Sequence, residues 1–496
     1  MEGQRHSGIL LHVTSLPGPY GIGDIGSGLE FVDFLAAAGQ RCWQFLPTCP
    51  TAAAFGHSPY MGLSALAGNI LFISPDLLVD HGWLAQEDIE PLPHVATPFT
   101  VDFQAVTAYK EQLLLLAHGR LTEEKRQVFA EFCAGQPWLD DYALFMVARN
   151  HYQGAWSDWP AELAARKPTA LAELAGRFPR QLELVKFGQF LFYEQWALLL
   201  KTARQRGVRL CGDIPIYVGH DSSDVWANQD CFLLDDDFLP SVVAGVPPDY
   251  FSATGQRWGN PLYSWETQGE KNKRLYDWWR QRFAIIGQQV DMVRIDHFRG
   301  FEAYWQVPAE EETALNGTWV KGPGRQFFSD LAEELADVAV IAEDLGIITP
   351  EVTALRDALG YPGMKILQFA FDSDERNLYL PFNVTENSVI YPGTHDNDTA
   401  LGWYMDGGVA QRSKDRLRRL ANSDGSAVHL DFIRLAYGSV ANLAIIPLQD
   451  VLGYGSDCRM NRPGTSHDNW LWRAGEVFSS DLANFLREEA RFYNRL

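Results

Sequence analysis

The segment DMVRIDHFRG (291–300) joins an apolar strand to a cluster of charged residues. Its apolar run, Met292–Ile295, contains Arg294 and is followed at once by Asp296. Residues two apart on a β-strand point to the same face, so Arg294 and Asp296 share one side of this strand. A nearly continuous apolar strand is typical of a parallel sheet covered on both faces. The charged residues at its end predict a polar site at the carboxyl edge of that sheet.

Seven further runs have the same apolar character: GILLHV (8–13), CWQFLP (42–47), RLCGDIPIYV (209–218), VAVIAED (338–344), MKILQFAF (364–371), SVIYPGTHD (388–396) and LAIIPLQDVLG (443–453). Helical patterns lie between many of them, at residues 27–39, 325–337 and 349–360, where a cap-like Ser27 and Thr349-Pro350 mark helix starts. Eight strands alternating with helices predict an α/β fold, a (β/α)8 TIM barrel. A doubly wound parallel sheet is the structural alternative.

Two connections are long enough to be insertions. Residues 50–205, after the second strand, have mainly helical patterns, whereas residues 219–280, after the third, are rich in Trp, Gly, Pro and Asp. No repeat or low-complexity linker marks a boundary, so we expect residues 1–496 to form a single catalytic domain, with 219–280 as a loop-rich insertion over the active site. About 43 residues follow the eighth strand (496 − 453), too few for a separate C-terminal β-domain.

Composition narrows the classes of function. The 41 basic and 63 acidic residues give a net charge of −22, which argues against a nucleic-acid partner. No basic amphipathic helix or 18-residue apolar run indicates membrane binding, and no signal peptide is evident, so we expect a cytoplasmic protein. The six cysteines have no metal-binding spacing, and we expect no metal and no cofactor. The motif GIGDIG (21–26) lacks the strand context of a dinucleotide site, and Asp235–Asp237 lacks EF-hand spacing.

Acidic residues close several of the predicted strands. They are Asp213 on the third strand, Asp296 on the fourth, Glu343-Asp344 on the fifth and His395-Asp396 on the seventh. Arg294 is expected to lower the pKa of Asp296 and keep it ionised, as a nucleophile requires. Glu343 follows an apolar run and is expected to have a raised pKa, as a general acid requires. Two carboxyls in opposed environments are the pattern of glycoside chemistry. The alternatives are a structural ion pair for Arg294–Asp296 and a helix cap for Asp344.

The segments VRIDHFRG, IAEDLG and YPGTHDNDT, in that order, resemble the signature blocks of the 4-α-glucanotransferases, also called amylomaltases or disproportionating enzymes, of the α-amylase clan. SLPGPYGIGDIG, GHSPYMGLSALAGN, GDIPIYVGHDSSDVW, GVPPDYFSATGQRWGNPLY and RMNRPGTSHDNWLWR resemble further family blocks, so the resemblance runs along nearly the whole chain. Asp468 and Leu66 depart from the family pattern, which puts fine substrate preference in doubt but not the reaction.

The resemblance implies a role for each matching residue. Asp296 is the expected nucleophile, forming a covalent glucosyl–enzyme intermediate, and Glu343 the acid and then the base. Asp396 and His395 are expected to hold the distorted sugar, and Arg294 to orient Asp296. The remaining residues expected to bind substrate are Tyr60, Asp213, Ser58, His297, Trp258, Asn260, Asp249 and His220, with Trp258 and the loop 247–260 lying over the glucan.

The expected reaction is transfer of part of an α-1,4-glucan to the 4-hydroxyl of an acceptor glucose or maltooligosaccharide, with retention through two displacements. A covering loop that holds the acceptor and excludes water would favour transfer. Two rivals differ in function. A hydrolase of the α-amylase clan would use water as acceptor, and a catalytically inactive glucan-binding protein would not need Asp296, Glu343 and Asp396 together.

Overall fold

Eight parallel strands close into a barrel in the computed structural model, which describes residues 4–92, 97–248 and 252–496. Neighbouring strands follow the order β1-β14-β13-β12-β11-β8-β3-β2 around the barrel. They are β1 (His6–Leu10), β2 (Cys42–Gln44), β3 (Arg209–Pro215), β8 (Met292–Asp296), β11 (Ala339–Ala342), β12 (Gly363–Ile366), β13 (Ser388–Tyr391) and β14 (Leu443–Pro447). Each overlaps one of the eight predicted apolar runs; β1 begins two residues and β12 one residue before its run, and the other six lie within theirs. The predicted (β/α)8 barrel is confirmed, and the doubly wound alternative is wrong because the sheet closes.

The strand register places the charged residues of the sequence motif. Arg294 of β8 lies opposite Asp213 of β3, and Asp296 lies opposite Pro215 at the carboxyl ends of the same strands. Towards the amino ends, the strands carry mainly apolar residues. Val293, Ile341 and Ile445, for example, are fully buried. Apolar burial supplies the driving force for closing the barrel, so the polar residues are left at its carboxyl end.

The three helices predicted at residues 27–39, 325–337 and 349–360 are present with different ends, and further helices lie between the strands. The helices outside the long insertions are α1 (Ile25–Ala37), α10 (Lys273–Gly287), α11 (Gly324–Asp330), α12 (Pro350–Ala358), α13 (Ala400–Met405), α14 (Gln411–Ala421), α15 (Val428–Gly438), α16 (Leu448–Val451) and α17 (Ser480–Phe492). Helix α1 begins before Ser27 because Asp24 is its cap and accepts a hydrogen bond from Ser27 N. Helix α11 ends at Asp330, and turns replace the rest of the predicted helix.

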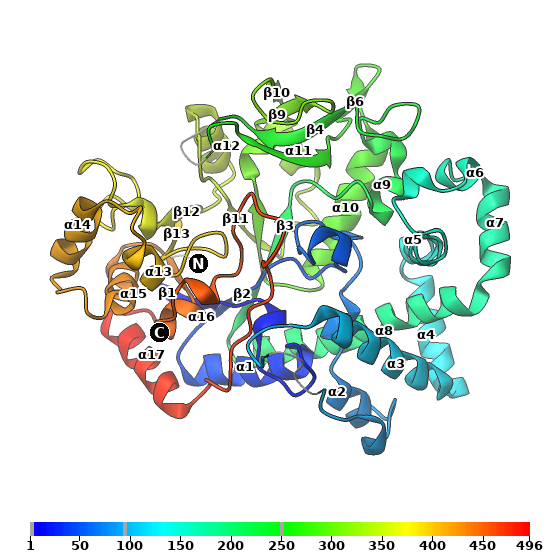
Figure 1. The fold of residues 1–496 in the computed structure, drawn as a ribbon, viewed down its shortest axis with the longest axis horizontal. Helices are drawn as coiled ribbons and strands as arrows, with labels where there is room; N and C mark the ends of the chain where they lie inside the picture. Colours follow the sequence, from blue (N-terminus) through cyan, green and yellow to red (C-terminus); the bar gives the residue numbers. More distant parts are fainter. Residues whose placement is uncertain (1–3, 93–96, 249–251) are drawn as a thin grey trace.

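Residues 50–205 are mainly helical, as the patterns predict, and their described part contains seven α-helices. They are α2 (Pro75–Asp80), α3 (Phe103–Gly119), α4 (Glu123–Ala134), α5 (Leu139–Tyr152), α6 (Ala161–Ala164), α7 (Pro168–Arg177) and α8 (Pro179–Gln205). Most of this group lies to one side of the barrel (Figure 1, cyan), while α8 runs back towards it and leads into β3. Gln189 and Gln195 on α8 each exchange two hydrogen bonds with the backbone of the segment before α2, which fixes that segment.

The region 219–280 contains regular structure that the sequence analysis missed. Besides α9 (Ser223–Ala227) and a small hairpin of β6 (Glu266–Thr267) and β7 (Glu270–Lys271), it supplies two strands of an antiparallel sheet in the order β10-β9-β4-β5. These strands are β4 (Val242–Val246), β5 (Gln256–Pro261), β9 (Ala303–Pro308) and β10 (Thr318–Lys321), so half of the sheet follows β8. The sheet stands apart from the barrel strands (Figure 1, green). Within the described ranges no helix is both long and apolar enough to cross a membrane.

Arg495 ties together the amino ends of two neighbouring barrel strands. Its buried guanidinium donates to the carbonyl oxygens of His6 at the start of β1 and Ala441 just before β14, both at 3.0 Å. It also donates to the carbonyls of Tyr437 at 2.8 Å and Ser439 at 2.9 Å. These contacts lie at the end of the barrel opposite the charged residues, so they bear on stability rather than on the site.

We expect Arg495→Met to lower the free energy of unfolding by roughly 3 kcal/mol, because four or more buried carbonyls lose their donor. Chemical denaturation with intrinsic fluorescence measures this change, and Arg491→Met, at an exposed position near the same chain end, is the matched control. Equal stability of the two variants would contradict the proposed tie between β1 and β14.

Candidate active site

A buried guanidinium joins two carboxylates at the carboxyl end of the barrel. One terminal nitrogen of Arg294 lies 2.8 and 3.0 Å from the carboxylate oxygens of Asp213, and the other lies 2.8 Å from Asp296 Oδ1. The side chains of Arg294 and Asp213 are 4% and 0% exposed, whereas that of Asp296 is 29% exposed. Arg294 therefore points Asp296 into the opening at the carboxyl end of the barrel, which we call the mouth. This orientation follows from the strand face that the two residues share.

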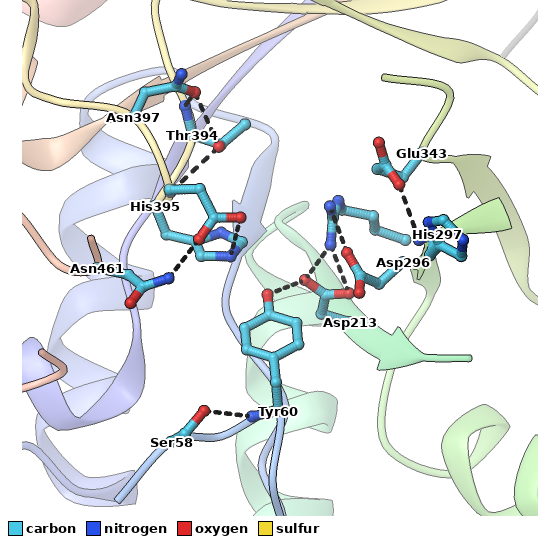
Figure 2. A network of polar contacts seen from close by, with 12 residues as sticks. Ser58, Tyr60, Asp213, Asp296, His297, Glu343, Thr394, His395, Asn397 and Asn461 are labelled. Carbon is cyan, nitrogen blue, oxygen red and sulfur yellow. Dashed lines mark hydrogen bonds and ion pairs between the residues drawn. The ribbon is translucent and has the colours of Figure 1, made fainter. Parts of the chain in front are cut away.

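Glu343 is held beside this ion pair by backbone amides. Its two carboxylate oxygens accept hydrogen bonds of 2.8 Å from the backbone N–H groups of His297 and Leu345. His297 has φ of 52°, a left-handed conformation that is uncommon outside glycine and that turns its N–H towards Glu343. Figure 2 shows the carboxyl group of Glu343 directed at His297, close to Asp296. The turn after β8 thus fixes the second carboxyl group.

A second polar group faces the ion pair across the mouth. Tyr60 donates from its hydroxyl to Asp213 Oδ2 at 2.8 Å, and its ring stacks on His395 with centroids 5.2 Å apart. His395 Nε2 lies 3.4 Å from Asp396 Oδ2, and Asn461 Nδ2 donates to Asp396 Oδ1 at 2.6 Å (Figure 2). The Asp396 side chain is 44% exposed, so it is open to a ligand from the mouth.

Burial separates the acid–base properties of the two central carboxyls. It raises the pKa of Asp296 to about 6, against the opposing effect of Arg294, while Asp213 and Asp396 add to the rise. The expectation of a lowered pKa for Asp296 is therefore wrong, because the desolvation of a group in this pocket outweighs one cation shared with Asp213. Burial also raises the pKa of Glu343 to about 8, and the charge of Asp296 adds to this rise. Near neutral pH, Asp296 is ionised and Glu343 is protonated.

Aromatic rings border the mouth on the side of His297. Trp258, on β5, meets the His297 ring edge-on with centroids 4.8 Å apart, and its centroid lies 6.5 Å from that of Tyr217. Burial lowers the pKa of His297 to about 3, so its ring is neutral. Trp258 is partly buried and thus leaves part of its surface open beside the ion pair. The antiparallel sheet positions this ring.

Two of the predicted substrate-binding residues, His220 and Asn260, make structural hydrogen bonds in the described part of the chain. His220 Nε2 lies 2.8 Å from the carbonyl oxygen of Phe238, and its ring packs against Trp156 of the helical insertion. Asn260 is buried and donates to the carbonyl of Val218 at 3.0 Å. These contacts hold the loops after β3 together. Ser58 contributes indirectly, since its Oγ accepts a hydrogen bond from Tyr60 N at 3.3 Å. Asp249 lies outside the described residues.

Sequence reasoning missed two residues that support Asp396. Asn461 contacts its carboxylate, and Arg459 donates to its backbone carbonyl at 2.6 Å. Both lie in the long connection after β14, within the block RMNRPGTSHDNWLWR, and only the resemblance of that block pointed to the region. In the described part of the chain, no group of three His, Cys, Asp or Glu side chains could hold a metal ion.

A closed parallel barrel with these carboxyls at its carboxyl end defines a (β/α)8 enzyme of the glycoside hydrolase type. The sequence model of the 4-alpha-glucanotransferase family, glycoside hydrolase family 77, matches residues 11–477. The chain belongs to this family.

Curated relatives and solved structures agree with this assignment. A 4-alpha-glucanotransferase of Synechocystis is 49% identical over 95% of this chain and 94% of its own length. One from Thermus thermophilus is 44% identical, with 95% of each chain covered. The structure of amylomaltase from Streptococcus agalactiae in complex with acarbose superposes with a TM-score of 0.94 at 35% identity, covering 99% of this chain and 100% of that chain.

The pKa values of the two central carboxyls predict a bell-shaped pH dependence. We expect kcat/KM for a maltooligosaccharide to rise as Asp296 ionises, with a midpoint of about 6, and to fall as Glu343 loses its proton, with a midpoint of about 8. Initial rates at low substrate concentration between about pH 4 and 10 measure both limbs. A rate that stays level through the fall expected for Glu343 would contradict the assignment of this residue as the acid.

Proposed function

We propose that the protein transfers a segment of an α-1,4-glucan to the 4-hydroxyl of glucose or of a maltooligosaccharide, by retaining double displacement through a covalent glucosyl–enzyme intermediate. The observation that carries this proposal is the arrangement of an ionised Asp296 on Arg294 next to a protonated Glu343. Membership of the 4-α-glucanotransferase family supports the same reaction class. The acceptor distinguishes this activity from hydrolysis.

The first displacement uses both carboxyls at once. An oxygen of Asp296 attacks the anomeric carbon of the donor glucan, and the bond from that carbon to the leaving 4-oxygen breaks. Glu343 gives its proton to the leaving oxygen, which departs as the 4-hydroxyl of the released glucan. Arg294 keeps Asp296 aligned for attack, since it contacts Asp296 Oδ1 at 2.8 Å and is itself anchored by Asp213. Glu343 ends this step as a carboxylate.

The second displacement reverses the roles. The carboxylate of Glu343 takes the proton of an acceptor 4-hydroxyl, whose oxygen attacks the anomeric carbon and releases Asp296. Two inversions at one carbon restore the α-configuration. The amides of His297 and Leu345 stabilise the ionised Glu343 between the two steps, because each donates to one of its oxygens. No other group has to move a proton.

Asp396 and His395 hold the sugar at the cleavage site. The exposed carboxylate of Asp396 accepts hydrogen bonds from ring hydroxyls, while Asn461 and His395 fix its orientation. Tyr60, stacked on His395, covers one side of the sugar, and Trp258 offers a ring face to the acceptor. Together these groups favour a bound sugar hydroxyl over water as acceptor.

The cell compartment belongs to this proposal as well. All six cysteines are free, including the buried Cys42, Cys211 and Cys231. Free cysteines are usual in a reducing compartment, which supports a cytoplasmic location. α-1,4-Glucans and maltooligosaccharides are the proposed partners, and the net charge of −22 disfavours nucleic acid.

Maltotriose is the substrate that separates transfer from its rivals. We expect pure protein to convert it to glucose and longer maltooligosaccharides, with no change in the total number of reducing ends, because each bond broken is matched by one formed. Chromatography with a reducing-end assay measures both quantities. Rising reducing ends would identify a hydrolase, and unchanged maltotriose would identify a binding protein.

A second test separates the roles of the two carboxyls. We expect Glu343→Gln to lower kcat on maltotriose by about 1,000-fold, since general acid–base catalysis contributes roughly 10²–10⁴-fold. With α-maltotriosyl fluoride, whose leaving group needs no proton, the variant should still form the covalent adduct and accumulate it. Mass spectrometry of a digest should place the adduct on Asp296. Asp296→Asn is the matched control and should give none; an adduct in that variant would exclude Asp296 as nucleophile.

A further inference from the structure

A small, partly open cavity lies beside His395, on the opposite side of the mouth from Glu343 (Figure 2). It measures about 20 Å³ and is bounded by the ends of β1, β13 and β14 and by the loops that follow them. Its polar lining comes from His12, Thr394, His395, Asp398, Asp450 and Arg459. Neither Asp296 nor Asp396 lines it, so it adjoins the site of the reaction through His395 alone of the residues assigned to that site.

Three polar atoms at this cavity have no hydrogen-bond partner among the described protein atoms. They are Nδ1 of His12, Nδ1 of His395 and Oδ2 of Asp450. Their residues are 6%, 5% and 1% exposed, so bulk water does not reach them freely. Asp450 Oδ1, by contrast, accepts a hydrogen bond of 2.6 Å from the backbone N–H of Ala400, the first residue of α13. Buried polar atoms without a partner are rare, and three around one cavity indicate a shared partner.

We propose that the cavity is a binding site for ordered water, and that this water links Asp450 to His395, making Asp450 a positioning residue for the His395–Asp396 pair. The inference rests on the proposed function of that pair. A cavity needs roughly 10–15 Å³ to hold one water, and a buried water needs two to four polar partners. The volume and the three atoms meet both requirements. A metal is a poorer occupant, since no three such groups in the described ranges are placed to hold one.

The proposed water would determine which nitrogen of His395 carries the proton. Burial lowers the pKa of His12 to about 3 and also lowers that of His395, so both rings are neutral and each carries a single proton. His395 can donate from Nε2 towards Asp396 only if its Nδ1 is an acceptor. A water that donates one hydrogen to each imidazole Nδ1, and accepts one from a protonated Asp450, satisfies all three atoms. This arrangement selects the tautomer of His395 that supports Asp396.

Ionisation of Asp450 upsets this arrangement. An ionised Asp450 accepts a hydrogen bond from the water. Only one hydrogen of the water is then left to donate to the two imidazoles. One of the two imidazoles then moves its proton to Nδ1, and in the molecules where this ring is His395, its Nε2 no longer donates to Asp396. Burial raises the pKa of Asp450 to about 7, with a further rise from Asp398. The charged or titratable groups around Asp450 are His12 on the β1 side, His395 and Asp398 after β13, and Arg459 in the loop after α16.

The first experiment locates the water. A crystal structure of the whole wild-type protein at about 1.3 Å resolution should show density in the cavity within hydrogen-bond distance of Asp450 Oδ2 and His395 Nδ1. Anomalous scattering data exclude a metal in the same density. A dry cavity, or a metal ion there, overturns the proposal, and this measurement needs no variant to fold.

The second experiment uses the pH profile, which a purely structural role would not change. In the wild type, kcat/KM on maltotriose should fall partly with a midpoint of about 7, before the complete loss at about 8. Asp450→Asn keeps an acceptor for Ala400 N and presents a permanent N–H donor to the cavity, so the partial fall should be absent. Asp450→Leu should lower kcat about tenfold with KM nearly unchanged, because the sugar-holding pair acts mainly in the transition state.

Asp431→Asn is the matched control. Asp431 is also buried and its pKa is also raised, but its carboxylate contacts Ser423 and it does not line the cavity. Its profile should match that of the wild type. Identical profiles for Asp450→Asn and the wild type would overturn the proposal. Absence of transfer activity in the wild type would instead overturn the proposed function. The failure of this inference and the failure of the proposed function are therefore distinguishable.

Discussion

The buried contact of Arg294 with Asp213 and Asp296 is the constraint on which the rest of the site depends. Removing the charge of Arg294 would leave two carboxylates without their shared cation, one of them the fully buried Asp213, which is strongly unfavourable in a protein interior. The contact requires β3 and β8 to be in register, because Asp213 and Arg294 lie directly opposite each other. The register in turn puts Asp296 at the lip of the barrel, where it is 29% exposed. With two carboxylates to one guanidinium, the lip carries excess negative charge, which suits the positive charge that develops on a sugar ring during glycosyl transfer.

The barrel and the insertions contribute different things to this site. The barrel strands and the turns after them supply the ionisable groups, Asp213, Arg294, Asp296 and Glu343. The insertions supply surfaces: Tyr60 precedes the helical insertion's first helix, and Trp258 lies on the antiparallel sheet. The ionisable groups therefore stand on the barrel, whereas the aromatic rings proposed to contact the glucan stand on the insertions. Such a division is consistent with loops that vary around a constant barrel.

Much of the fold could be predicted from the sequence, and the exceptions have physical reasons. The barrel strands are recognisable because burial on both faces makes them continuously apolar, as in the segment around Val293. Strands β4, β5, β9 and β10 escaped prediction because they are short, rich in Gly, Pro and Trp, and paired across the barrel strand β8. The carboxyls at the strand ends were predictable from position, but the direction of the pKa shift of Asp296 was not, since it depends on three-dimensional burial. The hydrogen bonds of His220 and Asn260 to backbone carbonyls could not be predicted either, because Phe238 and Val218 are brought to them only by the folding of the loops after β3.

The amides that bind Glu343 have a consequence for how this enzyme could change over evolution. Both donors belong to the main chain, at His297 and Leu345, so no replacement of a neighbouring side chain can delete them. Substitutions in the turn after β8 change the contact of the Glu343 carboxyl group with His297 N–H mainly by changing backbone angles. The left-handed φ of 52° at His297 is compatible with few residue types without strain. The contacts of Glu343 thus survive most point mutations nearby, whereas those of Asp396, which come from the side chains of Asn461 and His395, are lost whenever either residue is replaced by an apolar one.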